Sequence, residues 1–324
     1  MEPTEMTQIG TTGLKVTRLG MGGVAVGRIS TETEAVNTLD RCLELGVRYF
    51  DTAPSYGGGI GEERYGMVLP NVSRFTFTIS TKVGRLLEAD PPVPVGAVSG
   101  TSRTNIPFDF TYDSVMRCFE GSLVRLGLDN VDILLIHDPD NHYDQAMDGA
   151  YKALSELRSQ GVVRAIGAGM NQWEMEARLA REGDFDCFLL AGRYTLLDHA
   201  ALPQFLPLCQ EKNISVIIGG PYNSGILASD LSEAATFNYM PATAKVLNQA
   251  RRCKVVCDRH AVPLKAAALQ FVLSHPAVTA TIPGPRSVAE AEENFQMIGY
   301  PIPSALWAEL RQEGLIPAEA PTPQ

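Results

Sequence analysis

Along the chain, short runs of consecutive apolar residues alternate with longer stretches in which apolar positions recur at helical spacing. The apolar runs are continuous and do not alternate with polar residues, as expected for parallel strands that are covered on both faces. A strand followed by a helix, repeated eight times, closes into a parallel barrel. The pattern therefore predicts an α/β protein with the (β/α)8 TIM-barrel fold, with strands in residues 16–23, 47–54, 77–84, 131–138, 163–170, 187–194, 215–222 and 279–285.

The segments around these strands refine the predicted barrel. Residues 8–16 are typical of a small β-hairpin, which would plug the bottom of the barrel ahead of the first strand. Glycines that directly follow helical stretches are expected to end the helices in the left-handed conformation. The predicted helices include 33–45, 111–126, 145–159, 172–181 and 199–211, and the glycines are Gly46, Gly127, Gly161 and Gly183.

Two predicted connections, 86–109 and 223–241, are unusually long. Long loops are generally functional, and both leave the end of the barrel that holds the chemistry, so we expect them over its mouth. Residues 318–324 are polar and contain proline, which predicts a flexible tail. No linker divides the sequence, so residues 1–324 are expected to form one barrel domain.

Composition and charge indicate which partners, which cellular compartment and which metal sites to expect. The net charge is −10, with 27 basic and 37 acidic residues among 324, which disfavours nucleic acid and anionic membranes as partners. The six cysteines form no CxxC pair, as expected for reduced thiols in a cytoplasmic protein. Residues 1–8 carry no apolar signal core, and no run approaches the ~18 apolar residues of a membrane span. The five histidines lack paired ligand spacing, so no catalytic metal is expected.

Four polar residues at or just after the ends of three predicted strands form a candidate catalytic set: Asp51, Tyr56, Lys82 and His137. Strand ends at the carboxyl face of a barrel are where barrel enzymes keep their chemistry. A free tyrosine, with a pKa near 10, is almost inert as a base at neutral pH, but a neighbouring ammonium lowers that pKa. Such a set can therefore transfer a proton.

Each of these residues also has a structural interpretation. Asp51 and Lys82 could be an ion pair at the rim of the barrel, Tyr56 could be a surface tyrosine and His137 could cap a loop. The position of all four at predicted strand ends favours catalysis.

Five ordered motifs carry a family resemblance. The first motif is residues 13–16 with 19–22, the second is residues 50–57 and the third is residues 80–82. The fourth runs from residues 125–127 through Asp132 to His137, and the fifth is residues 282–284 with 292–294. With these motifs the chain resembles the aldo-keto reductases over nearly its whole length. The resemblance implies hydride transfer between a nicotinamide cofactor and a carbonyl or alcohol carbon, with Asp51, Tyr56, Lys82 and His137 as the catalytic tetrad.

The same resemblance implies a cofactor site, although residues 20–27 lack the GxGxxG spacing of a dinucleotide fingerprint. Residues 167–171, Ala191 and Gly220 depart from the family pattern for nicotinamide contacts, so Asn171 would have to hold the carboxamide. The implied cofactor-binding residues are Gly22, Gly23, Asp51, Asn171, Pro221, Asn223, Gly225, Leu227, Gly284, Arg286, Glu290, Glu293 and Asn294.

Segments 108–113, 136–140 and 223–227 are similar to one branch of the family: the dehydrogenases of L-fucose and other D-threo-aldoses, with relatives acting on L-galactose or pyridoxal. The expected reaction is oxidation of an aldose at C1 to a lactone, by a monomer or small homo-oligomer. The alternatives are a general aldehyde or ketone reductase and a pyridoxal dehydrogenase. A non-catalytic cofactor-binding subunit and a barrel enzyme using Lys82 as a Schiff base represent other classes.

Two residues bear on the choice between NAD and NADP. At the adenosine end of the cofactor, Glu290 stands where the family commonly has a basic or amide residue that meets the 2′-phosphate of NADP. A carboxylate accepts hydrogen bonds from a ribose hydroxyl and repels a phosphate, which predicts a preference for NAD. Arg286 favours NADP, because a guanidinium can bind phosphate.

Overall fold

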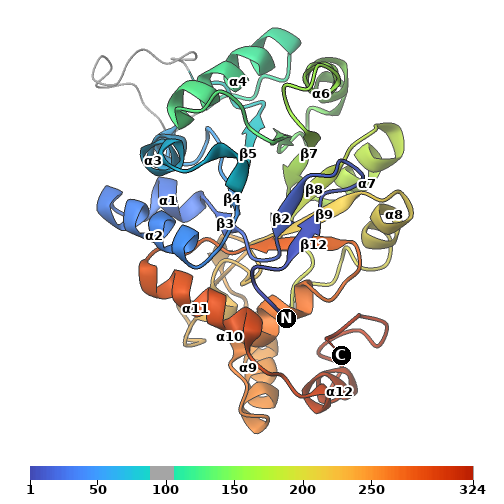
Figure 1. Cartoon of the computed structure of the whole chain (residues 1–324). Coiled ribbons are helices and arrows are strands. Elements are labelled where there is room, and N and C mark those ends of the chain that lie inside the picture. Colours follow the sequence, from blue (N-terminus) through green and yellow to red (C-terminus); the bar gives the residue numbers. More distant parts are fainter. Residues whose placement is uncertain (88–105, 324) are drawn as a thin grey trace.

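The computed structural model describes residues 1–87 and 106–323, and these form the predicted (β/α)8 barrel (Figure 1). The eight parallel strands follow one another in sequence order around the sheet. Leu19 bridges to Thr281, and the Gly20 N–H donates to the Thr281 carbonyl at 2.9 Å, which joins the last strand to the first. The strands are β3 (Met21–Gly22), β4 (Tyr49–Asp51), β5 (Thr78–Val83), β6 (Ile133–His137), β7 (Ala165–Met170), β8 (Cys187–Ala191), β9 (Ser215–Gly219) and β12 (Val278–Ile282).

Helices surround the strands, and the predicted helices are present with changed bounds (Figure 1). The helix expected from residue 199 begins only at Phe205, because Pro203 has no N–H and disfavours a helical residue before it. The helices are α1 (Val24–Arg28), α2 (Glu32–Glu44), α3 (Ile60–Val68), α4 (Tyr112–Leu126), α5 (Tyr143–Gln145), a π-helical segment (Ala146–Tyr151), α6 (Lys152–Ser159), α7 (Trp173–Glu182), α8 (Phe205–Glu211), α9 (Ala244–Arg259), α10 (Leu264–Val272), α11 (Val288–Gly299) and α12 (Ser304–Gln312).

Three of the four predicted glycine caps are confirmed. Gly46, Gly127 and Gly161 have φ angles of 89°, 61° and 73°. The prediction for Gly183 is wrong, because its φ is −125° and the chain leaves α7 in an extended conformation. A Cβ at Gly183 would lie 2.4 Å from the Phe185 ring, so close packing explains this glycine.

The predicted hairpin closes the bottom of the barrel. Strands β1 (Met6–Gln8) and β2 (Lys15–Thr17) pair antiparallel, and the turn between them buries Ile9 and Leu14 among side chains of the barrel interior. The Thr78 hydroxyl donates to the Lys15 carbonyl at 2.9 Å, which ties the hairpin to the start of β5. The opposite end, where the strands finish, is therefore the open mouth.

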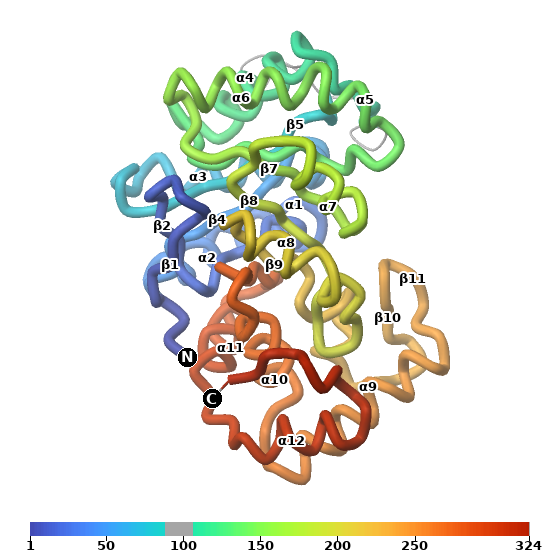
Figure 2. Tube along the Cα trace, turned by 90° about the vertical axis from the view of Figure 1, so that its right-hand side faces the viewer, coloured from blue at the N-terminus to red at the C-terminus, as the bar shows by residue number. Residues whose placement is uncertain are grey.

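The structure can be compared with the predictions for the two long loops and for the C-terminal tail. Most of loop 86–109 lies outside the described residues. Loop 223–241 contains a 3-10 turn (Ile226–Ala228) and a short hairpin, β10 (Thr236–Phe237) with β11 (Met240–Pro241), which stands to one side of the barrel in Figure 2. In the expected flexible tail, Ala320 is buried and its carbonyl accepts from Arg311, so this part packs beside α12.

Two predictions, on membrane-spanning segments and on the cysteines, can be compared with the described residues. None of the helices within 1–87 and 106–323 is both long and apolar enough to cross a membrane. All six cysteines are buried and unpaired, in agreement with reduced thiols.

Candidate active site

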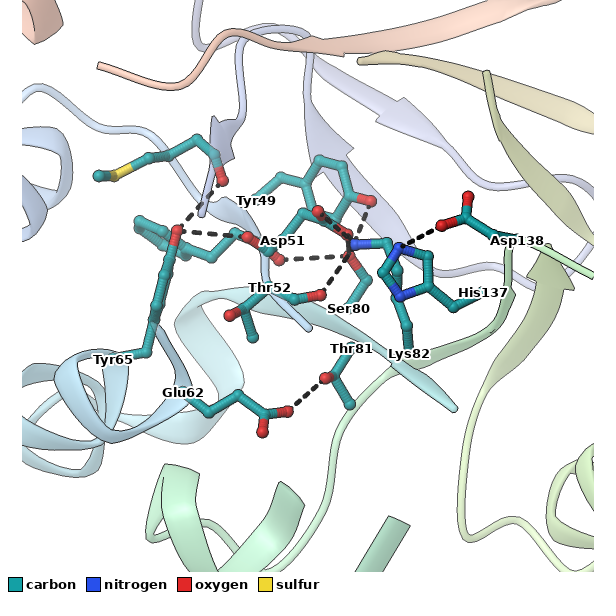
Figure 3. Close-up of polar contacts among 12 residues, drawn as sticks. Tyr49, Asp51, Thr52, Glu62, Tyr65, Ser80, Thr81, Lys82, His137 and Asp138 are labelled. Atoms are coloured by element: carbon teal, nitrogen blue, oxygen red, sulfur yellow. Dashed lines mark hydrogen bonds and ion pairs between the residues drawn. The ribbon is translucent and has the colours of Figure 1, made fainter. Parts of the chain in front are cut away.

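A buried ion pair lies at the centre of the barrel mouth (Figure 3). Lys82 Nζ donates to Asp51 Oδ1 and Oδ2 at 2.9 and 2.7 Å, and to the Thr52 carbonyl at 2.9 Å. The side chains of Lys82 and Asp51 are only 1 % and 2 % exposed. Burial alone would lower the pKa of Lys82, but the Asp51 carboxylate raises it above its ordinary value. Lys82 is therefore a fixed cation.

Strand geometry explains how this pair forms. Asp51 is in register with Ser80 on the neighbouring strand, so the Ser80 hydroxyl donates to Asp51 Oδ1 at 2.7 Å. Lys82 follows two residues later, on the same face of β5, because side chains alternate along a strand. The Tyr49 hydroxyl is 3.0 Å from the Ser80 oxygen and extends the network into the barrel interior.

Tyr56 is held beside the ion pair by close backbone packing. A Cβ at Gly27 would lie 2.4 Å from the Tyr56 carbonyl, and one at Gly57, where φ is 70°, would lie 2.0 Å from the Gly27 carbonyl. The loop of Tyr56 can therefore rest on α1 only if both positions are glycine. Lys82 Nζ lies 4.7 Å from the centroid of the Tyr56 ring.

The surroundings of Tyr56 set its protonation state. Burial raises the pKa of Tyr56 to about 12, against the lowering effect of the Lys82 charge. The expectation that Lys82 would lower this pKa is correct for the pairwise effect and wrong for the net shift. At neutral pH, Tyr56 is a protonated phenol.

His137 completes the set at the end of β6. Its ring lies edge-on to the Tyr56 ring, with centroids 6.0 Å apart, and the residue is 7 % exposed. Burial, together with the charges of Lys82, Arg85 and Arg28, lowers the pKa of His137 well below its ordinary value. The imidazole is therefore neutral and can donate a hydrogen bond from one nitrogen only.

The structure brings together all four residues of the predicted set. A fixed cation, a phenol and a neutral imidazole around one space can exchange a proton with an oxygen placed among them. The ionised state of Lys82 argues against a Schiff-base enzyme, which needs a neutral amine. Within residues 1–87 and 106–323, no group of three His, Cys, Asp or Glu side chains is placed to hold a metal ion.

Comparison with known proteins places this site in a family. The model of the Aldo/keto reductase family matches residues 18–313. The chain belongs to the aldo-keto reductases. It is therefore an oxidoreductase acting on small-molecule carbonyl compounds, in a family that uses nicotinamide cofactors.

Similar aldo-keto reductases cover almost the whole chain. The chain is 37 % identical to pyridoxal 4-dehydrogenase from Microbacterium luteolum, over 98 % of this chain and 99 % of that protein. It is 36 % identical to D-threo-aldose 1-dehydrogenase from a Pseudomonas species, over 94 % and 96 %. The holo form of an aldo-keto reductase from Bacillus halodurans has the same fold, with a TM-score of 0.78, 25 % identity and coverage of 98 % and 97 %.

Two amides from the segments after β7 and β9 bind the end of β8, and they fit the nicotinamide end of such a cofactor. Asn171 donates to the Ala191 carbonyl at 2.8 Å, and Asn223 donates to the Gly192 carbonyl at 3.2 Å. Asn223 is 2 % exposed, yet its Oδ1 has no hydrogen-bond partner within the described residues. A buried acceptor of this kind needs a donor, and a primary carboxamide supplies one. Asn223 is therefore a second candidate, beside Asn171, for holding the carboxamide.

The predicted residues of the adenosine end are grouped at the start of α11. The carboxylate of Glu290 accepts from the backbone N–H of Arg286 and from its Nε, both at 2.8 Å. Burial would raise the pKa of Glu290, but the contacts with Arg286 lower it overall. Glu293 pairs with Lys265, and Asn294 Oδ1 accepts from the Tyr222 hydroxyl at 2.7 Å, which ties α11 to the loop after β9.

The remaining predicted cofactor residues lie near the same edge of the mouth. Pro221 and Gly225 belong to the turns after β9, whereas Leu227 is 1 % exposed and its N–H already donates to the Tyr222 carbonyl. Gly22, Gly23 and Gly284 line the join between β3 and β12. A Cβ at Gly22 would meet the Ile282 carbonyl at 2.8 Å, and one at Gly23 would meet the Asp51 carbonyl at 2.6 Å. Contacts within the protein thus already require glycine at these two positions.

Several polar residues around the ends of the strands were not predicted from the sequence. Ser80 stands two positions before Lys82, and that spacing alone could have placed both on one face. Arg85 and Asp138 form an ion pair beside His137, at 2.9 Å. Outside the mouth, on the helix-covered side of β5, Glu62 and Arg125 form a second buried pair, at 2.7 Å, and Glu62 also accepts from Thr81. No local pattern links residues so far apart in the chain.

Proposed function

We propose that this aldo-keto reductase oxidises the anomeric carbon of an aldose to a lactone, with transfer of a hydride to NAD+. The arrangement of Tyr56 between a fixed ammonium and a neutral imidazole carries the proposal. The choice of an aldose is supported by the similarity to D-threo-aldose 1-dehydrogenase over 94 % of the chain.

The roles of the four residues follow from their chemistry. The nicotinamide ring of the bound cofactor would supply the hydride acceptor. His137 would donate a hydrogen bond to the anomeric oxygen and fix its orientation. Tyr56, as the phenolate, would accept the hydroxyl proton from that oxygen, and the Lys82 ammonium would stabilise the phenolate. Asp51 would hold Lys82 in place and keep it charged.

The same residues would serve the reverse reaction at lower pH. A phenol whose pKa is raised to about 12 is a proton donor at neutral pH, which suits carbonyl reduction. Oxidation needs the phenolate, so its rate would increase as pH rises toward that pKa. The oxidation is therefore proposed as an alkaline activity.

NAD is proposed as the preferred cofactor. A 2′-phosphate bound by Arg286 would lie close to the Glu290 carboxylate, which contacts the same guanidinium and would repel the phosphate. A ribose 2′-hydroxyl can instead donate to Glu290 while the ion pair persists. The pair therefore favours NAD over NADP.

A pyridoxal dehydrogenase is the second candidate, because the chain is 37 % identical to pyridoxal 4-dehydrogenase over 98 % of its length. A panel of aldoses, pyridoxal and simple alcohols, each with NAD+ and with NADP+, separates the candidates when cofactor reduction and lactone formation are both measured. The proposal predicts the highest kcat/KM for an aldose, with stoichiometric lactone. Reduction of NAD+ by pyridoxal alone would exclude the aldose assignment.

A further inference from the structure

An ion pair at the barrel mouth joins Arg85 and Asp138, neither of which belongs to the tetrad. Arg85 Nη2 donates to Asp138 Oδ2 at 2.9 Å, and the two side chains are 25 % and 29 % exposed. The same Asp138 oxygen lies 3.6 Å from His137 Nε2, which is longer than a hydrogen bond (Figure 3). A carboxylate therefore borders the space beside the imidazole that would bind the reacting oxygen.

Asp138 is held at this position by its backbone. Its φ angle is 49°, a left-handed conformation that few non-glycine residues adopt and that carries strain. Its N–H donates to the Gly169 carbonyl at 3.1 Å, which fixes the residue on the end of β7. Strain of this kind persists where the surrounding structure holds it, and it clusters at functional sites.

Arg85 is held in turn by the segment that leads into α4. Its guanidinium lies 3.9 Å from the centroid of the Phe108 ring, and the two residues form an antiparallel bridge. Gly84, at φ 100°, allows this turn, because a Cβ there would lie 2.1 Å from the Phe110 ring. Among the described residues, Arg85 is the cation that orients the carboxylate of Asp138.

The carboxylate keeps unused capacity to accept hydrogen bonds. An ionised carboxylate has about four acceptor sites. Within the described residues, the partners of Asp138 all contact Oδ2, and its partial exposure leaves the group accessible from the mouth. A hydroxyl that donates to Asp138 would lie next to an oxygen that accepts from His137.

We propose that Asp138 binds the hydroxyl group on the carbon adjacent to the reacting carbon, so that the enzyme selects vicinal hydroxyl compounds, such as aldoses that retain the 2-hydroxyl. In such a substrate the two oxygens are neighbours, as are His137 Nε2 and the Asp138 carboxylate. The inference rests on the proposed function, because it takes the His137 side of the site as the place of the reacting oxygen.

The test compares an aldose that the enzyme oxidises with its 2-deoxy counterpart, using purified full-length protein and NAD+. A hydrogen bond to a charged group corresponds to a factor of about 10–100 in kcat/KM. The wild-type enzyme should prefer the 2-hydroxy sugar by about that factor. Asp138→Ala should lose the preference, with kcat/KM for the 2-deoxy sugar changed less than about three-fold, and Asp138→Asn should lie between them.

A variant of a comparable ion pair controls for structural effects. Asp186 binds Arg158 at 2.9 Å, with side chains 12 % and 23 % exposed, at the opposite end of the strands from the mouth. Asp186→Ala should leave the ratio between the two sugars unchanged, whatever its effect on Tm. Equal losses of kcat/KM on both sugars in Asp138→Ala, or a wild-type ratio near one, would overturn the inference and leave the proposed function standing. Absence of aldose oxidation in the wild type would overturn both.

Discussion

Replacing Asp51 by Asn should weaken both the fold and the catalysis, because it leaves Lys82 as an uncompensated buried cation. The two side chains are 2 % and 1 % exposed and are joined by contacts of 2.7 and 2.9 Å. Removing one partner of such a pair costs about 3–5 kcal/mol. Asparagine keeps one acceptor, and the Thr52 carbonyl remains at 2.9 Å, so we expect a loss near 3 kcal/mol. Urea unfolding at constant m-value measures it.

The activity of Asp51→Asn should fall together with its stability. Without Asp51, the pKa of Lys82 falls, and Tyr56 loses the charge that stabilises its phenolate, so kcat should decrease about 100-fold or more. The measurement is kcat at a temperature where circular dichroism shows the variant to be folded.

Glu62→Gln is the matched control for this effect. It also breaks a buried pair, since Glu62 and Arg125 are 0 % and 4 % exposed and lie 2.7 Å apart, but neither is assigned to the reaction. Its unfolding free energy should fall by a similar amount, while kcat of the folded protein should remain within about two-fold. Equal losses of kcat in both variants would show that the lower stability of the fold, and not the charge of Lys82, explains the loss of activity. An Asp51→Asn protein with wild-type stability and kcat would refute the reasoning outright.

Three further outcomes are expected. The rate of oxidation should rise about ten-fold or more between pH 7 and pH 9, since the pKa of Tyr56 is raised to about 12 and the phenolate is scarce below it, and a rate that falls steadily over this range would contradict that role. Gly27→Ala should lower kcat about 100-fold with a smaller effect on KM, because the new Cβ would lie 2.4 Å from the Tyr56 carbonyl and displace the phenol, and steady-state kinetics checks this. Glu290→Gln should move the ratio of kcat/KM values toward NADP+ by about ten-fold, because it releases Arg286, and an unchanged ratio would remove this pair from the cofactor site.

The parts of the site that were predictable from sequence are those set by strand geometry. Asp51, Lys82 and His137 each finish or nearly finish a strand of a parallel barrel, so their side chains had to meet at one end. Tyr56 follows β4 within one short loop, which limits its distance from Asp51. Continuous apolar runs predicted the strands because burial on both faces leaves few positions for polar side chains.

The parts that were not predictable depend on packing between distant segments. From the sequence, Glu290 was expected to favour NAD and Arg286 to favour NADP. In the structure the two side chains instead form an ion pair at the start of α11. Their spacing of four residues was the available signal. The net rise in the pKa of Tyr56 results from burial, which the loop sequence does not reveal. The left-handed conformation of Asp138 was not predicted either, although aspartate is one of the non-glycine residues that adopt it most often.

The most direct test of the account is to measure kcat and cofactor affinity together in Tyr56→Phe. The change removes only the hydroxyl that carries the proton, so aldose oxidation should fall by about 10²–10⁴-fold. Binding of NADH, followed by fluorescence titration, should remain within about three-fold of wild type, because the ring and its contact with Lys82 persist. A folded Tyr56→Phe protein with near-normal kcat would contradict the central claim that Tyr56 transfers the proton.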